Sequence, residues 1–289
     1  MRWIAAILAL AGCLAAEPNK LDTSTPVGKA FGRMYAFDFP GARAILDREI
    51  QSAPQEPLPY AVEAAVYLFD ELYRLKILQI EFFEDDAKVV DRKKLVPDPA
   101  LRAEFFRLVE AAKQRANARL ATLPDDRDSL FTLCMAAGLM TDYAALVERR
   151  RFGSFFLARQ TQVYVRKLLA LQPPVYDAYL AMGTTEYVVG SIPFYLRWLV
   201  HIDNIEGSKK RGMEMVQLVA ERGRYYGPFA RILLAAAHLR EKRLDEAQRL
   251  LEGVLAEYPG NPLIIKELER IAELRHVAEA TGKVRTRPR

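Results

Sequence analysis

The chain has 289 residues, of which 51% are hydrophobic and 27% are charged. This composition supports a large folded core and excludes an intrinsically disordered protein. The formal net charge of +5 is small for this length, and the basic clusters are scattered along the chain. A nucleic-acid-binding groove requires such clusters to converge, so we expect no nucleic-acid partner.

The first residues have the layout of an export signal. Arg2 precedes the apolar run 3–16, which is too short to span a bilayer permanently. We expect residues 1–16 to be a signal peptide and the polar residues 17–25 to be a tether. The mature protein is then exported, as a periplasmic protein or a membrane-anchored lipoprotein.

Two processing routes remain open at this signal. Residues 10–13 read Leu-Ala-Gly-Cys and resemble the lipobox of bacterial lipoproteins, in which the cysteine, here Cys13, receives a lipid and becomes the new N-terminus. Ordinary cleavage after residue 15 or 16 would instead remove Cys13. By either route Cys134 is left without a cysteine partner, so we expect no internal disulfide.

Apolar residues then recur at three- and four-residue steps, which is typical of amphipathic helices. Their spacing predicts a first helical hairpin over 27–35 and 40–52, with a turn at Phe39, Pro40 and Gly41. It next predicts one long helix over 60–83, a loop over 84–99 and a helix over 101–123.

The third pair of helices begins at Asp125 and Asp126, because carboxylates favour the positive N-terminal end of a helix. This helix runs through Met140, and its partner covers about 154–171. Residues 148–153 between them fit either a turn or a continuous helix, and the sequence leaves both open.

The fourth pair is interrupted. Residues 174–190 read as its first helix, but an extra amphipathic piece is inserted over 191–206 before the second helix at 208–222, in which Gly212 is the small residue. A fifth pair follows within 231–259. Residues 261–281 form a capping helix, because one side of them is apolar and the other charged, and residues 282–289 are a basic tail.

A small residue stands twelve positions before a proline four times, in the pairs Ala42–Pro54, Ala112–Pro124, Thr161–Pro173 and Ala247–Pro259. This spacing suits a second helix that needs a small side chain where it crosses the first and that ends before a proline. Within 231–259 the pattern is complete, with Leu234 and Ala235 on the first helix and Ala247, Leu251 and Val254 on the second.

Residues 231–259 therefore resemble a tetratricopeptide repeat. The resemblance implies an all-α, right-handed superhelical solenoid of stacked antiparallel helix hairpins over residues 26–260. Such repeats bind other protein chains rather than perform chemistry. His238 takes the place where the repeat usually has tyrosine, so we interpret it as a core residue.

A longer stretch, about 175–263, is similar to a group of bacterial exported tetratricopeptide proteins. The motifs that carry the likeness are Tyr-Asp-Ala-Tyr at 176–179, Gly-Ser-Ile-Pro at 190–193, Lys-Arg-Gly at 210–212 and Arg-Gly-Arg-Tyr at 222–225. A looser likeness extends to the eukaryotic inclusion-body clearance family of tetratricopeptide proteins. Related sequences tend to have Gly-Asp-Arg before the Lys-Arg-Gly helix, whereas residues 204–208 here read Asn-Ile-Glu-Gly-Ser. The resemblance implies a helical scaffold with no defined reaction and no cofactor.

In a tetratricopeptide repeat, a protein or peptide segment lies in the concave groove. We transfer the groove positions of the repeat to this sequence one by one. We expect the groove to be lined by Arg150, Asp177, Leu180, Thr184, Tyr187, Phe229, Ile232, Ala236 and Arg240. The alternative is that the inserted piece or the next repeat covers about half of these residues.

The sequence thus predicts a non-catalytic protein-binding scaffold, and no catalytic motif was found. A first alternative is a lipid-anchored outer-membrane assembly adaptor, held at the membrane surface through Cys13. A second is an enzyme or metal-binding protein that uses 191–206, where His201, Asp203 and Glu206 are the nearest approach to a ligand cluster.

Overall fold

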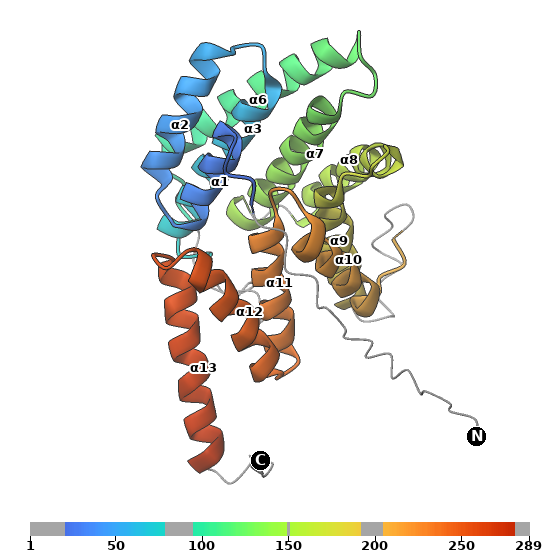
Figure 1. Cartoon of the computed structure of the whole chain (residues 1–289). Helices are drawn as coiled ribbons and strands as arrows, with labels where there is room; N and C mark the ends of the chain where they lie inside the picture. Colours follow the sequence, from blue (N-terminus) through green and yellow to red (C-terminus); the bar gives the residue numbers. More distant parts are fainter. Residues whose placement is uncertain (1–20, 79–94, 149–150, 192–204, 281–289) are drawn as a thin grey trace, which may run out of the picture.

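The computed structural model of the protein describes residues 21–78, 95–148, 151–191 and 205–280. Over these ranges every regular element is a helix and no strand is present (Figure 1). The helices follow one another in contact along the chain, so the predicted all-α solenoid of stacked hairpins is confirmed. The signal peptide, Cys13 and the basic tail lie outside the described residues.

The described helices pair in chain order, each helix packing on its partner and each pair on the next (Figure 1). The pairs are α1 (Pro26–Tyr35) with α2 (Phe39–Ser52), α3 (Pro57–Arg74) with α6 (Pro99–Leu120), α7 (Arg127–Asp142) with α8 (Arg151–Ala170), α9 (Tyr179–Ser191) with α10 (Lys209–Arg222), and α11 (Gly227–Arg240) with α12 (Leu244–Glu257). A π-helical turn (Tyr143–Val147) extends α7, a 3₁₀ turn (Tyr176–Ala178) precedes α9, and α13 (Pro262–Ala280) follows the last pair.

The small residues of the repeated pattern lie on the second helix of their hairpins, as expected. Ala42, Ala112 and Ala247 are fully buried, and Thr161 is 5% exposed. Each of these helices ends two to four residues before its proline. The spacing in the sequence therefore reports a real packing constraint, namely that the paired backbones approach closely at this position.

Two sequence predictions about helix ends were wrong. The helix expected over 60–83 ends at Arg74, because Lys76 takes a left-handed backbone conformation (φ 58°) and Ile77 N–H bonds back to the Leu72 carbonyl. Ile77 is buried, so an apolar residue that seemed to continue the helix instead closes its end. The first turn also lies earlier than expected, since Asp38 caps a helix that already begins at Phe39.

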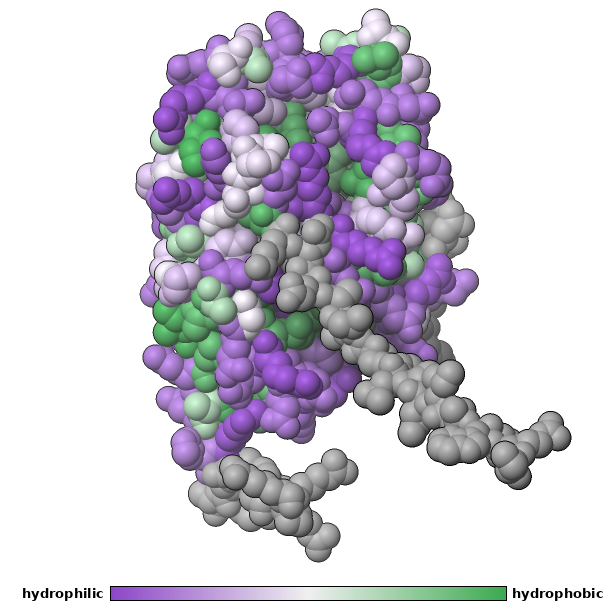
Figure 2. Space-filling view, in the orientation of Figure 1, coloured by the Kyte–Doolittle hydropathy of each residue, from purple (hydrophilic) through white to green (hydrophobic). Residues whose placement is uncertain are grey.

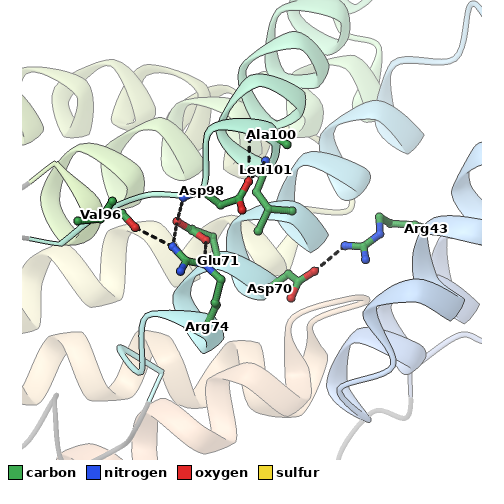
Figure 3. Close-up of polar contacts among 8 residues, drawn as sticks. All are labelled: Arg43, Asp70, Glu71, Arg74, Val96, Asp98, Ala100 and Leu101. Atoms are coloured by element: carbon green, nitrogen blue, oxygen red, sulfur yellow. Dashed lines mark hydrogen bonds and ion pairs between the residues drawn. The ribbon is translucent and has the colours of Figure 1, made fainter.

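One polar cluster ties the end of α3 to the start of α6 (Figure 3). Glu71, which is 2% exposed, accepts hydrogen bonds from Nε and Nη2 of Arg74 and from the Asp98 N–H. Arg74 also donates to the Val96 carbonyl. Asp98 in turn caps α6 by accepting the N–H groups of Ala100 and Leu101. The cluster fixes where α6 begins relative to α3.

The two helices of the fourth hairpin cross at a pair of glycines. A side-chain carbon placed on Gly212 would lie 2.6 Å from the Gly183 carbonyl oxygen and 2.7 Å from the Tyr187 backbone nitrogen. The predicted role of Gly212 as the small residue of this hairpin is confirmed. Most of the predicted insertion, residues 192–204, lies outside the described residues.

The first hairpin touches the last one, so the solenoid closes on itself. The Tyr35 hydroxyl donates to the Tyr225 carbonyl at 2.9 Å, and the Asn261 side-chain amide donates to the Tyr35 carbonyl at 2.9 Å. Asn261 also caps α13 by accepting the N–H groups of Leu263 and Ile264. These bonds join α1 to both turns that flank the last hairpin.

By length and composition, one described helical stretch, Arg127–Val147, could cross a membrane. Its most apolar window is 67% buried inside the bundle. The apolar side chains of this stretch therefore pack in the core, against the neighbouring helices.

The glycine crossing gives a stability test. We expect Gly212→Ala to destabilise the protein by about 2–4 kcal/mol, because the added methyl group meets backbone atoms that cannot yield. The matched control is Gly253→Ala on α12, where the nearest atom would be an Arg231 nitrogen at 3.8 Å. That variant should be about 0.5–1 kcal/mol more stable than the parent. Urea unfolding followed by circular dichroism measures both, and equal effects would contradict the close crossing.

Candidate functional site

The centre of the solenoid is filled by aromatic side chains from helices far apart in the sequence. Phe31 of α1 stacks on Tyr225 with ring centroids 5.1 Å apart, and Phe131 of α7 stacks on the same ring at 5.8 Å. Phe69 of α3 meets Phe229 of α11 edge-on at 5.8 Å. The inner helices of non-neighbouring hairpins therefore touch, and the protein's own rings occupy the middle of the concave wall.

A buried carboxylate holds the turn that presents these rings. Asp177 is 3% exposed, and its oxygens accept the backbone N–H groups of Arg224, Tyr225 and Tyr226 at 2.7, 2.9 and 2.7 Å. Burial raises the pKa of Asp177, and the three N–H donors oppose that rise. A side-chain carbon on Gly223 would lie 2.6 Å from the Val219 carbonyl oxygen, so the turn also needs a glycine.

The motifs at 176–179 and 222–225 prove to be the two halves of one contact. Besides the bonds to Asp177, the Arg222 guanidinium donates to the Tyr176 hydroxyl at 3.1 Å and lies 5.4 Å from the centre of its ring. The residues that carry the family resemblance in these motifs are therefore used to fix the junction between α10 and α11.

A second buried carboxylate, which the sequence pattern did not single out, holds the start of α10. Glu186 of α9 is fully buried and accepts the N–H groups of Gly207 and Ser208 at 2.9 and 3.0 Å. Arg211 lies 3.8 Å from its other oxygen. Gly207 has a φ of 78°, which favours glycine. The available signal was a lone acidic residue within the otherwise uncharged stretch 178–191.

The structure corrects the expected groove. Asp177, Leu180 and Ala236 are buried, and Asp177 is bound to its own backbone, so these three are not open to a partner. Phe229 is half-buried against Phe69. Arg150 lies outside the described residues. The positions that keep part of their surface accessible are Thr184, Tyr187, Ile232 and Arg240.

Cys134 and His238, two chemically reactive side chains, lie in or against the core. Cys134 is buried, and desolvation raises the pKa of its thiol to about 12, so it is not a thiolate at neutral pH. His238 is half-buried, its Nδ1 has no hydrogen-bond partner, and desolvation lowers its pKa. This environment agrees with the interpretation of His238 as a packing residue.

Glu63 of α3 is a further buried carboxyl, 3% exposed. Desolvation, together with repulsion from Asp47, raises its pKa to about 7, and attraction from Arg107 opposes the rise. Asp47 and Arg107 lie on α2 and α6, so Glu63 faces the packing between hairpins and not a cleft.

The described part of the chain contains no group of three or more His, Cys, Asp or Glu side chains that could hold a metal ion. Of the residues predicted as a ligand cluster, His201 and Asp203 lie outside the described residues. Glu206 is described, and it pairs with Arg211 at 3.1 Å.

A shallow pocket of about 380 Å³ lies where α1 meets the turn between α12 and α13. Its charged lining residues are Lys29, Arg33 and Glu257, and Arg231 already binds the Glu257 carboxylate through two nitrogens. On the face seen in Figure 2, hydrophobic areas are small and separated by hydrophilic residues. A partner on that face would therefore contact a mixed surface.

Comparison with known proteins bears on the last hairpin. The tetratricopeptide repeat family model matches residues 228–271, which cover α11, α12 and the first half of α13. Over these residues the chain is similar to a tetratricopeptide repeat. The match overlaps the segment 231–259 that the sequence spacing singled out, with Leu234, Ala235, Ala247 and Leu251 all buried in the hairpin. No curated protein matches the chain.

The buried turn gives a second stability test. We expect Asp177→Asn to destabilise the protein by about 2–4 kcal/mol, because the amide nitrogen would face backbone N–H groups that need an acceptor. Asp125→Asn, at an exposed position before α7, should change stability by no more than about 0.5 kcal/mol. Thermal unfolding of the two variants compares them. Equal stability would show that the carboxylate does not hold the turn.

Proposed function

We propose that the protein is a non-catalytic scaffold that binds another protein through its tetratricopeptide hairpins. The observation that carries this proposal is the repeat match at residues 228–271 within a stack of similar hairpins. Repeats of this kind generally mediate protein–protein contacts, because each hairpin leaves part of its inner helix available to a partner.

The surface that best fits the proposal lies on α9 and α11, the inner helices of the last two hairpins. Both pack on α10, and their apolar residues join one cluster that includes Leu180, Val216 and Leu234. Thr184 and Ile232 are half-buried on these helices. Since the middle of the concave wall is filled, the partner should be a peptide segment that lies along this edge of the wall.

Site-specific photocrosslinking tests this surface. A benzophenone amino acid placed at Thr184 or Ile232 should give one discrete adduct in native cells, because both side chains border the partner. The control position is Glu252, which is exposed on α12. The same adduct pattern from Glu252 as from Ile232 would contradict the proposal.

We further propose that the scaffold is exported and acts in the periplasm or at a membrane surface. The support is the arrangement of Arg2, the apolar run 3–16 and the polar residues after it. The lipid-anchored adaptor remains the alternative within this proposal, because Cys13 ends a lipobox-like sequence.

The mass of the protein purified from its native cell distinguishes these routes. We expect a mature chain that begins either at an acylated Cys13 or just after residue 15 or 16. Cys13→Ala should abolish acylation in the first case and leave the mature mass unchanged in the second. An intact chain starting at Met1 in the cytosol would overturn the export proposal.

A further inference from the structure

The outer face of α8 is basic along its described length. Its exposed positions are Arg159, Gln160, Val163, Arg166, Lys167 and Ala170. These residues are separated by one, three or four positions and therefore form one continuous helix face, about 17 Å long at 1.5 Å per residue. The whole helix, residues 151–170, contains no aspartate or glutamate.

Two cations of this face, Arg166 and Lys167, are not neutralised locally. Within the described ranges, Arg166 and Lys167 make no ion pair, whereas exposed cations on other helices do, such as Arg107 with Glu104 and Lys113 with Glu110. The acidic residues of α9 and of the 3₁₀ turn before it, which both pack on α8, are also engaged elsewhere. Asp177 and Glu186 are buried and bound to backbone N–H groups. Arg166 and Lys167 therefore present uncompensated positive charge to a partner.

The shape of the α8 face favours one class of anionic partner over another. A convex helix surface has no groove that would fix the register of a peptide, but it can lie against a flat surface that carries many negative charges. Val163 is 43% exposed between the cations, so one apolar side chain is available for shallow contact with lipid. An anionic bilayer fits these features better than an acidic protein segment does.

We propose that the outer face of α8 is a docking surface for anionic phospholipid headgroups. Arg166 and Lys167 supply the charge, and Val163 lies between them and Arg159. The site is separate from the peptide-binding edge on α9 and α11, and it does not depend on lipidation of Cys13. It would set which side of the scaffold faces a membrane.

Vesicle flotation tests the docking surface. The full chain carrying Cys13→Ala, which cannot be acylated there, is mixed with vesicles of phosphatidylcholine alone or with one third phosphatidylglycerol. We expect tighter binding to the anionic vesicles, and this binding should weaken as salt is added.

The double variant Arg166→Gln with Lys167→Gln should lower binding to the anionic vesicles on the order of tenfold. The matched control is Lys209→Gln with Lys210→Gln, which removes two exposed charges from α10 and should have a much smaller effect.

Three results would overturn the proposal. The first is equal binding to both kinds of vesicle, and the second is an equal loss in the α8 and α10 variants, which would indicate attraction by net charge alone. The third is binding of polyglutamate that the α8 variant loses, without binding to anionic vesicles, which would assign the face to an acidic protein. Circular dichroism of each variant confirms that the fold is intact, and the N-terminal apolar run is common to all of them.

Discussion

The architecture depends on one buried carboxylate, that of Asp177. By accepting three successive N–H groups it fixes the turn between α10 and α11, and this turn places Tyr225 and Tyr226 at the centre of the molecule. Phe31, Phe131 and Tyr35 then pack or bond to those two residues. A local set of hydrogen bonds thereby organises contacts between residues almost two hundred positions apart. Because the Asp177 carboxylate is buried, the three N–H donors offset the cost of removing it from water.

The helical pairs could be predicted from the sequence because they rest on local rules. Apolar periodicity located the helices, and Ala42, Ala112, Thr161 and Ala247 marked the crossings because each backbone pair needs a small side chain there. The helix end at Arg74 was missed for a related reason. Ile77 continues the apolar period, but it is buried as the residue that closes the helix, and periodicity alone cannot separate these two uses of an isoleucine.

Several residues expected to line the binding groove are buried, because exposure is set by long-range contacts. Asp177 and Ala236 were expected to line the groove, yet they are buried by contacts that the local pattern does not encode. Phe69 and Phe229 illustrate this, since they come from hairpins that are not neighbours and nothing in the spacing of either helix relates them. The motifs at 176–179 and 222–225 were noticed as a resemblance, but their mutual contact required coordinates.

The double role of Asn261 has a consequence for how the molecule comes apart. A linear array of repeats can fray from either end, because each unit contacts only the units beside it. Here a single amide side chain both begins the terminal helix and holds the carbonyl of Tyr35 in the first one. Unfolding of α13 therefore also breaks a bond to α1, and the reverse holds. The hairpins should then unfold together in one cooperative transition and not one by one.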